Sequence, residues 1–279
     1  MAEKSFLARM AHASRERASK ARAAEPEGAL LNRALAAEKP PGLVLSHFNL
    51  FAEFKLRSPA EGPLAGSHCD QHAQLKAYAA GGATAVSVLT EPEEFKGSLT
   101  HLQEASRILN PLGVPVMRKD FITDPYQVLE ARAAGAGGVL LIVSILSDEE
   151  TLALIDSAQA CGLFVLLEGF TVKDLQRIKA LIATLPATSE KLILVGVNCR
   201  NLKTLKVDFT RFAKLAKQLP EQTVAVAESG IANTQNVAEV ARWGYRGALV
   251  GSALMTSSDP ARTTAELIAA GRKTAALRG

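Results

Sequence analysis

Cysteine is scarce in this chain, and the three that occur, Cys69, Cys161 and Cys199, lie far apart. They match neither the paired pattern of a disulfide framework nor the close spacing of a zinc site. The first 25 residues also lack the continuous apolar stretch and the cleavage site of a secretory signal. Together these absences favour a reducing compartment, and we expect a cytoplasmic protein.

Long apolar runs and aromatic residues are also few. No run approaches the ~20 residues that a membrane span needs, so we expect no membrane partner. The formal net charge is only +4, and much of it lies near the start of the chain, where aromatic side chains are not interleaved. A solvated helix face explains that basic run better than a nucleic-acid site does. We expect no nucleic acid, and basic residues elsewhere favour an anionic small molecule.

What the chain does contain is a regular alternation of apolar runs and alanine-rich stretches. With 279 residues and 48% hydrophobic content, it can bury a large core without stabilisation by disulfides or bound metal. From about residue 49, eight runs rich in Val, Leu and Ile follow one another. They begin near Leu50, Ala83, Val114, Gly138, Leu163, Leu192, Thr223 and Gly247.

These runs predict the fold. Continuous apolar strands, without alternation of apolar and polar residues, are typical of parallel sheets covered on both faces. Eight strand–helix units favour a closed barrel over an open doubly wound sheet. We therefore predict an α/β protein with a single (β/α)8 TIM barrel over residues 49–279. Residues 1–48 are predicted to form a helical extension of two helices, 5–24 and 26–36, packed on or across the barrel.

Several residues predict where the helices begin and end. Ser147 and Glu150 have the spacing of a capping box. Asp124 stands before Pro125, which suits a first helical turn. Thr171 opens another amphipathic stretch, and Gly162 is placed to end the helix before the fifth run.

Candidate catalytic residues stand where the runs end, because barrel enzymes place their chemistry at the C-terminal ends of the strands. Any one of these polar residues could simply be the first solvated residue after a strand. Their convergence on one mouth instead indicates acid–base chemistry on an anionic substrate, and no His or Cys cluster there suits a metal. The candidates are Glu53 and Lys55 (first run), Lys119 (third), Glu168 (fifth), Asn198 and Arg200 (sixth) and Glu228 (seventh).

Two short glycine-containing turns follow the seventh and eighth runs. They are Ser229-Gly230 and Gly251-Ser252. In barrels of this kind a phosphate often binds at that position, on backbone N–H groups and at the start of a short helix. Cys199, at the end of the sixth run, has no histidine near it in sequence, so we expect a packing residue and not a nucleophile.

Seven segments, taken together, resemble the indole-3-glycerol phosphate synthase family of tryptophan biosynthesis. They occur in order over about residues 51–256. They are AEFKLRSP (52–59), AVSVLTEPEEFKGS (85–98), RKDFITDPYQV (118–128), VLLIVSIL (139–146), GVNCRNLKTLKVD (196–208), AESGI (227–231) and VGSALM (250–255).

The resemblance implies a carboxy-lyase, a carbon–carbon lyase without cofactor or metal. Its substrate would be 1-(2-carboxyphenylamino)-1-deoxyribulose 5-phosphate, and its products indole-3-glycerol phosphate, CO2 and water. Lys119 matches the general acid of ring closure, and Glu168 the group that transfers protons during dehydration. Lys55, beside Glu53, matches a second lysine that holds the substrate carboxylate or delivers a proton. Asn198 and Arg200 match groups that hold substrate hydroxyls and charge, and Glu228 matches a buried acid that supports the lysines.

The resemblance also implies the remaining pocket residues and a monomer or weak homodimer. The phosphate cradle would be Ser58, Ser229, Gly230, Gly251 and Ser252. The walls around the anthranilate ring would be Phe95, Phe121, Leu140 and Leu202.

The chain departs from the family pattern at four places, one of which is a less regular first loop, AEGPLAGSHC (60–69). Glu-Val-His at the end of the fifth run is here Glu168-Gly169-Phe170, an asparagine is replaced by Cys199, and residues 40–49 lack an Arg-Asp-Phe segment. We expect Phe170 to pack under the first turn of the helix opened by Thr171, without effect on substrate choice.

Three other functions remain open. A divergent paralogue would close the same ring on a modified arylamino sugar phosphate. A non-catalytic barrel would bind a phosphorylated ligand, although it would have no use for both Lys119 and Glu168. The neighbouring pathway isomerase would need a cysteine–aspartate pair, where the first run offers Glu53 and Lys55.

Overall fold

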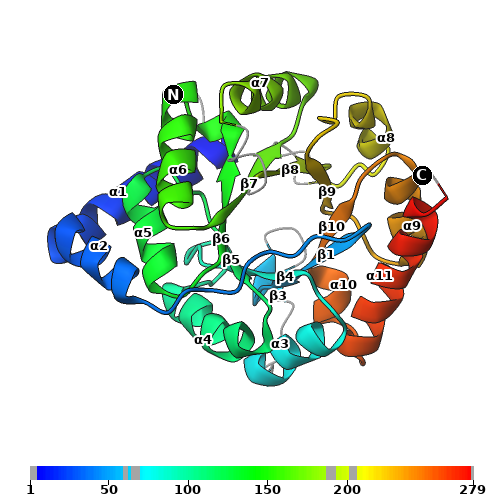
Figure 1. Ribbon diagram of the computed structural model, residues 1–279, viewed down its shortest axis with the longest axis horizontal. Coiled ribbons are helices and arrows are strands. Elements are labelled where there is room, and N and C mark those ends of the chain that lie inside the picture. The colour runs from blue at the N-terminus through cyan, green and yellow to red at the C-terminus, as the bar shows by residue number, and fades with distance from the viewer. Residues whose placement is uncertain (1–4, 59–61, 64–69, 187–192, 201–205, 278–279) are drawn as a thin grey trace.

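The computed structural model describes residues 5–58, 62–63, 70–186, 193–200 and 206–277. Eight parallel strands close into a barrel in the order β1-β10-β9-β8-β7-β6-β5-β4 (Figure 1), which confirms the predicted fold. The barrel strands are β1 (Asn49–Phe54), β4 (Ala85–Leu89), β5 (Val116–Lys119), β6 (Gly138–Ile142), β7 (Phe164–Gly169), β8 (Ile193–Asn198), β9 (Val224–Glu228) and β10 (Gly247–Val250).

Two apolar layers explain why the strand sequences are apolar throughout. One layer lies between the strands and the surrounding helices and includes Leu50, Val88 and Val195. The other fills the barrel interior and includes Phe51 and Phe164, whose rings meet edge to face at 6.4 Å. Alternate residues of each strand enter one layer or the other, so both faces of the strands are mainly apolar.

The helices follow the strands in turn and surround the barrel. They are α3 (Gln71–Ala80), α4 (Leu99–Leu109), α5 (Pro125–Ala133), α6 (Asp148–Ala160), α7 (Val172–Ala183), α8 (Arg211–Ala216), α9 (Thr234–Arg242), α10 (Ser252–Met255) and α11 (Pro260–Ala275). Short 3-10 helices, η1 (Asn110–Leu112) and η2 (Val143–Ile145), follow α4 and β6, and β2 (Arg57–Ser58) pairs with β3 (Gly62–Pro63) beyond β1.

The predicted helix boundaries are confirmed. Ser147 forms a reciprocal capping box with Glu150 at the start of α6. Thr171 does the same with Asp174 at α7, and Asp124 caps α5 ahead of its N1 proline. Gly162 follows α6 with φ of 69°, a left-handed conformation that glycine adopts without steric cost.

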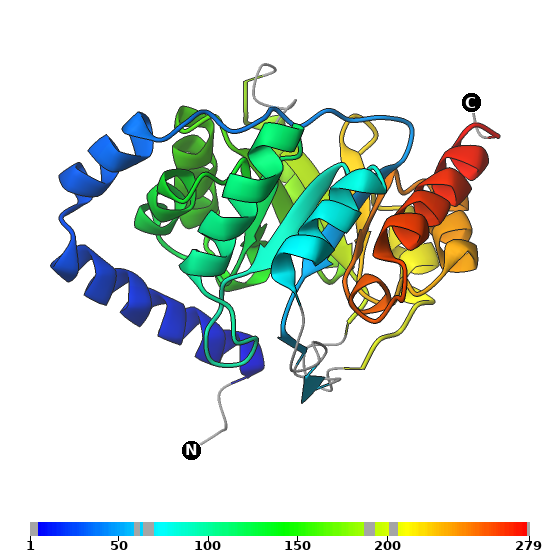
Figure 2. The same ribbon diagram turned by 90° about the horizontal axis from the view of Figure 1, so that it is seen from below.

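Two helices, α1 (Phe6–Ala24) and α2 (Glu27–Ala36), precede the barrel, as predicted. Figure 2 shows them as a V beside the barrel, with the start of α1 near the end where β2 and β3 lie. From α2 the chain crosses the opposite end of the barrel and enters β1. Phe6, Leu7 and Met10 pack against the interior apolar layer at the C-terminal ends of the strands. The start of α1 therefore covers part of the barrel mouth.

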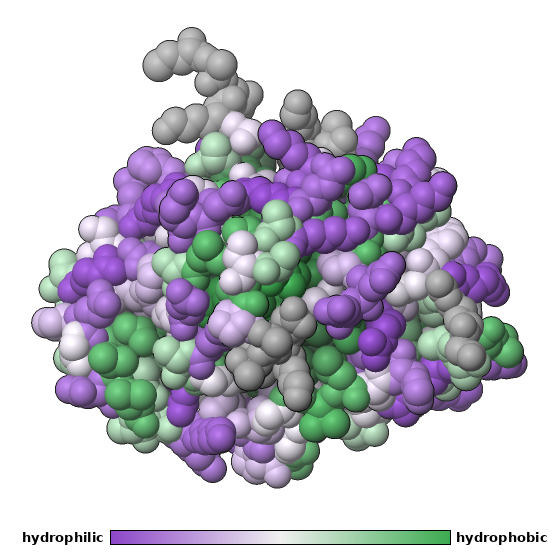
Figure 3. All heavy atoms as spheres, turned by 45° about the horizontal axis from the view of Figure 1, so that its top comes forward, coloured by the Kyte–Doolittle hydropathy of each residue, from purple (hydrophilic) through white to green (hydrophobic). Residues whose placement is uncertain are grey.

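The outer surface is mainly hydrophilic on the face drawn in Figure 3, where hydrophobic areas are separated by polar and charged side chains. Among the large apolar residues in the described ranges, Leu35, Val44 and Leu277 are the most exposed, and they stand apart in sequence. Within the described part of the chain, no helix has the length and apolarity to cross a membrane.

Candidate active site

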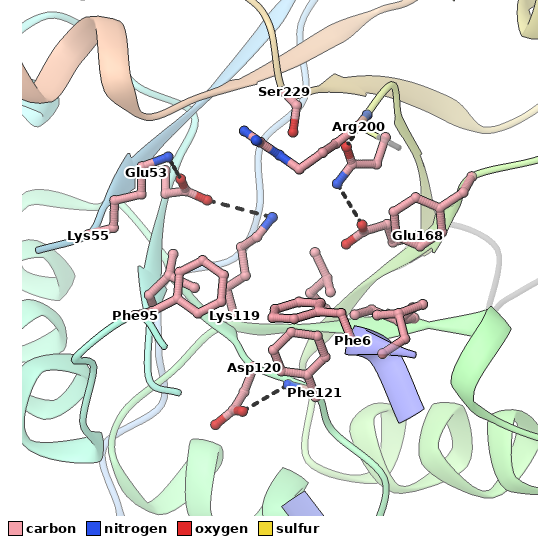
Figure 4. A pocket seen from close by; sticks show the side chains of 16 residues that line it. Phe6, Glu53, Lys55, Phe95, Lys119, Asp120, Phe121, Glu168, Arg200 and Ser229 are labelled. Atoms are coloured by element: carbon pink, nitrogen blue, oxygen red, sulfur yellow. Dashed lines mark hydrogen bonds and ion pairs between the residues drawn. The ribbon is translucent and has the colours of Figure 1, made fainter. Parts of the chain in front are cut away.

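Two lysines and three glutamates meet at the mouth of the barrel. Lys55 Nζ lies 2.9 Å from Glu53 Oε1, and Lys119 Nζ lies 3.6 Å from Glu53 Oε2. Lys119 also donates to Glu228 Oε2 at 3.1 Å. On the other side of the mouth, Glu168 Oε1 accepts a hydrogen bond of 2.8 Å from the Asn198 amide. Figure 4 shows Lys119 directed between Glu53 and the side where Glu168 lies.

The barrel itself brings these side chains together. They come from β1, β5, β7, β8 and β9, at or just beyond the C-terminal end of each strand. The register pairs Glu168 with Gly196 and Asn198 with Glu228 on neighbouring strands. A side chain at Gly196 would collide with the Glu228 carboxylate, so glycine there makes room for the buried acid. The convergence predicted from the strand ends is therefore present.

The charges of the cluster sustain one another. Burial lowers the pKa of Lys119, but Glu228, Glu53 and Glu168 outweigh that effect, and the net pKa lies above its usual range. Burial raises the pKa of Glu53, yet Lys55 and Lys119 hold it below its ordinary value. Lys119 is therefore charged in the free protein. Burial alone would lower the pKa of this lysine, but the facing carboxylates raise it by more.

The other two carboxyl groups are shifted the opposite way. Burial raises the pKa of Glu228 to about 8, with a further increase from the charge of Glu168. Burial also raises the pKa of Glu168, against the opposing effects of Lys119 and Asn198. Because the charge of Glu168 acts on Glu228, the two carboxyl groups resist simultaneous ionisation. The mouth therefore holds an exchangeable proton near neutral pH, as an acid–base site requires.

An expected consequence is a stability that falls as the pH rises from 5 to 8. In that range Glu228 retains a proton in the folded state, whereas in the unfolded chain, with a pKa of 4.5, it is ionised. While the folded state holds one more proton than the unfolded chain, each unit of rising pH lowers the free energy of unfolding by up to about 1.4 kcal/mol. The shifts of Lys119 and Glu53 lie outside this window, because one pKa is raised above 10.5 and the other lowered below 4.5.

Urea unfolding at several pH values measures this effect. Glu228→Gln has no proton to lose at this position, so the titration behind the raised carboxyl pKa is absent from the variant. We expect a flatter pH dependence of unfolding in the variant than in the unaltered chain. Equal slopes would contradict the raised carboxyl pKa.

An aromatic pocket adjoins the charged cluster. Three of the predicted wall residues, Phe95, Phe121 and Leu140, line it. Phe121 meets Phe95 at 6.4 Å and Phe6, from α1, at 6.0 Å between ring centroids. The fourth predicted wall residue, Leu202, lies outside the described residues. Such walls would suit a flat apolar ring.

Phe170 also lines this pocket, so the expectation that it packs under the first turn of α7 is wrong. The residue at that place is Gly169, where a Cβ would lie 3.0 Å from the Asp174 Cβ and 3.3 Å from Ile178. Strand alternation then turns Phe170 to the barrel interior, on the same side as Glu168. The backbone N–H of Phe170 donates to Asp174 at 2.9 Å, and its carbonyl accepts from Arg211, which hold the residue there.

A second, more polar part of the cavity lies toward β9 and β10. Ser229, Gly230, Gly251 and Ser252 line it together with Lys55. Ser229 and Gly230 both have positive φ, 68° and 71°, which turns the backbone after β9 toward the cavity. Ser58 belongs to β2, but its side chain lies outside the described part of the structure.

The sixth strand end contributes three consecutive residues with different surroundings. Asn198 Oδ1 accepts a hydrogen bond from the Arg200 backbone N–H at 2.9 Å, which shapes the turn. Arg200 lines both parts of the cavity. Cys199 is fully buried in the outer apolar layer, and burial raises the pKa of its thiol to about 12. The prediction that Cys199 is a packing residue is confirmed.

Sequence reasoning missed five pocket residues besides Phe170. Asp120 and Phe6 are the most informative. Asp120 is part of the quoted RKDF segment, so its position beside Lys119 was a usable signal. Phe6, Leu7 and Met10 form one apolar edge of an otherwise polar helix, but the sequence does not say which part of the barrel that edge faces. The missed residues are Phe6, Leu7, Leu89, Asp120 and Ile142.

Comparison with known proteins agrees with this geometry. The family model described as indole-3-glycerol phosphate synthase matches residues 9–267. A protein of that name from Kineococcus radiotolerans is 43% identical over 222 residues, covering 80% of this chain and 76% of its own. Another from a Nocardioides species is 44% identical over 235 residues, covering 82% and 85%.

Similar solved structures show the fold alone. A 3-hexulose-6-phosphate synthase from Salmonella typhimurium has a TM-score of 0.61 and 14% identity, covering 81% of this chain and 100% of its own. A thiamine phosphate pyrophosphorylase from Pyrococcus furiosus has a TM-score of 0.57 and 16% identity, covering 82% and 97%.

The closed barrel and the charged mouth place this molecule among the (β/α)8 enzymes that perform acid–base chemistry at their strand ends. Within that class, the family match spans nearly the whole chain, and the relatives exceed 40% identity. The chain belongs to the indole-3-glycerol phosphate synthase family.

Proposed function

We propose that the chain catalyses the synthesis of indole-3-glycerol phosphate from 1-(2-carboxyphenylamino)-1-deoxyribulose 5-phosphate, with release of CO2 and water, as a carboxy-lyase of tryptophan biosynthesis. The observation that carries the proposal is the joining of three features in one mouth. These are an aromatic pocket, a buried lysine–glutamate cluster and a polar cavity at the ends of β9 and β10. They suit the aryl ring, the reacting carbons and the phosphate of this substrate, respectively.

The aryl ring would lie among Phe6, Phe95 and Phe121, with its carboxylate toward Lys55. The ribulose chain would then extend past Lys119 to the polar cavity that Gly230 lines. This orientation puts the sugar carbonyl near Lys119 and keeps the apolar ring away from the charged groups. It also leaves Arg200, which lines both parts of the cavity, beside the substrate hydroxyls.

Ring closure needs a proton donor. The ring carbon that bears the carboxylate attacks the sugar carbonyl, and negative charge develops on the carbonyl oxygen. Lys119, held in its charged form beside the ionised Glu53, would donate that proton. Once the lysine has lost its proton, its carboxylate partners favour its reprotonation. Loss of CO2 then leaves the bond electrons in the new ring.

Dehydration needs an acid at the leaving hydroxyl and a base for a ring-carbon proton. Glu168 lines the same pocket as Lys119, and burial raises its pKa, which favours a protonated carboxyl that can act as an acid. Asn198 fixes its orientation through the 2.8 Å hydrogen bond. One lysine and one glutamate, separated across the mouth, thus supply the two acid–base functions.

We expect a bound sulfate or phosphate ion to mark the phosphate site. In crystals grown with either ion, it should lie near the backbone of Gly230, Gly251 and Ser252, since N–H groups of two adjacent turns can converge on one anion. Arg200 would lie close by. An ion found only at the opposite end of the barrel would contradict this assignment.

The proposed function is tested by two assays on the intact chain. The purified protein should produce indole fluorescence from the synthetic substrate, and its gene should restore growth to a tryptophan auxotroph that lacks its own synthase. A folded protein that does neither would exclude the function. Lys119→Ala in the same strain is the control for rescue by the encoded activity.

One observation favours a second candidate, the paralogue that acts on a modified arylamino sugar phosphate. Phe170 faces the pocket, where the resembling family pattern has histidine, and so it changes the wall next to Glu168. Substrates that carry an added ring substituent discriminate the two. The pathway enzyme should prefer the unsubstituted ring, and the paralogue a substituted one.

A further inference from the structure

Arg17 reaches from the middle of α1 to the rim of the barrel mouth. Its Nη2 donates to Asp120 Oδ1 at 2.7 Å, and its Nη1 lies 3.9 Å from Glu91 Oε1. Both carboxylates are buried, with side chains 1% and 0% exposed. Nη1 is itself buried and has no hydrogen-bond partner among the described residues. One guanidinium thus forms ion pairs with two buried carboxylates, which lie on two different turns.

Each of these carboxylates fixes a turn that carries a wall of the aromatic pocket. Asp120 accepts from the Thr90 hydroxyl at 2.8 Å and from the Phe121 backbone N–H at 2.8 Å, and it lies 3.3 Å from Arg118 Nη2. The bond to Phe121 N–H is drawn in Figure 4. Asp120 therefore sets the turn directly after Lys119.

Glu91 does the same for the neighbouring turn after β4. Its two carboxylate oxygens accept the backbone N–H groups of Glu93, Glu94 and Phe95 at 2.7–3.0 Å. Three consecutive amides on one side chain leave the turn little freedom. Phe95 therefore takes its place in the pocket from Glu91.

We propose that Arg17 is a positioning residue for recognition of the aryl ring. Through Asp120 and Glu91 it fixes the turns of Phe121 and Phe95, and through its own helix it places Phe6 against Phe121. The inference rests on the proposed function for the identity of the ring. The contacts of Arg17 with Asp120 and Glu91, which link the two turns, are independent of the proposed function.

The docking of α1 on the barrel does not depend on Arg17 alone. Arg22 forms two hydrogen bonds to Asp124 at 2.6 and 3.1 Å, and Ser14 accepts one from Gln127 at 2.8 Å. These contacts are to α5 or its cap and not to residues that line the pocket. Loss of Arg17 should therefore disturb the pocket walls while α1 stays docked.

Steady-state kinetics of Arg17→Met and Arg22→Met separate positioning from docking. For Arg17→Met we expect KM to rise about tenfold or more with kcat within about threefold, the pattern of lost ground-state and transition-state binding alike. Arg22→Met, the matched control on the same helix, should keep KM within about threefold. Arg17→Lys should give an intermediate KM, because an ammonium cannot present the two arms of a guanidinium.

Amide hydrogen exchange provides a readout without substrate. In Arg17→Met the amides of residues 93–95 and 121 should exchange faster than in Arg22→Met. Unchanged exchange and unchanged KM in folded Arg17→Met would overturn the proposal, and so would an equal KM effect in both variants. If the unaltered chain has no activity, the proposed function fails, whereas the exchange comparison still decides whether Arg17 fixes the turns. Should Arg17→Met fail to fold, Arg17→Lys takes its place in both measurements.

Discussion

Lys119→Ala is expected to abolish nearly all turnover while substrate binding changes by about an order of magnitude or less. Loss of a positioned proton donor typically costs about 10²–10⁴-fold in rate. The turns assigned to the phosphate and most of the aromatic walls do not involve this side chain, so the affinity should survive. Turnover is measured by indole fluorescence, and binding by equilibrium titration with the variant.

The variant should also fold, which makes the measurement interpretable. Removal of Lys119 leaves Glu228 without its cation, but Glu228 already has a raised pKa and can become neutral. Lys173→Ala, at an exposed position in the first turn of α7, is the matched control and should keep full activity. Near-normal turnover by Lys119→Ala would remove this lysine from the mechanism.

The sequence alone could predict the barrel because its signal is repeated. Eight apolar runs and the helix caps point to the same answer, so an error in one of them would not change the fold. The mouth could be predicted for a similar reason. Glu53 and Lys55 share a strand side, and barrel closure puts all strand ends on one rim. These inferences use only local pattern and topology.

The properties that could not be predicted from the sequence depend on the surroundings of individual side chains in the folded protein. Phe170 was misplaced because a residue just past a strand can face either layer, and only the close contact of Gly169 with α7 decides which. The net pKa of Lys119 could not be predicted either, since burial and the facing carboxylates act in opposite directions and their balance depends on distances. Arg17 stands in a basic run that reads as a solvated face, yet its partners are buried acids more than 70 positions away.

The two ends of the mouth also differ in how they hold protons. On the β1 side, Glu53 stays ionised between two lysines. On the β7 side, burial beside walls such as Phe170 raises the pKa of Glu168 and favours its neutral form, although the hydrogen bond from Asn198 acts in the opposite direction. Lys119 stands between the two sides. In the proposed reaction, this asymmetry would place the permanent charge at the substrate carboxylate end and the exchangeable proton at the dehydration step.

Glu168→Gln tests the role of Glu168 in the dehydration step. Glutamine keeps an oxygen that can accept from Asn198, so the shape of the pocket should be preserved, but it cannot transfer a proton. We expect kcat to fall about 10²–10⁴-fold with KM within a few fold. Glu266→Gln, at an exposed position in α11, is the matched control and should be fully active.

A single-turnover experiment with Glu168→Gln then locates the blocked step. Because CO2 leaves before water, a group that acts only in dehydration leaves ring closure and decarboxylation intact. CO2 should therefore be released at a rate near that of the unaltered chain, while indole fluorescence develops slowly. In Lys119→Ala both signals should be slow, because the carbonyl is never protonated and the ring never closes. If CO2 and indole are delayed together in Glu168→Gln as well, then Glu168 acts at ring closure with Lys119, and the division of labour between the two sides of the mouth is wrong.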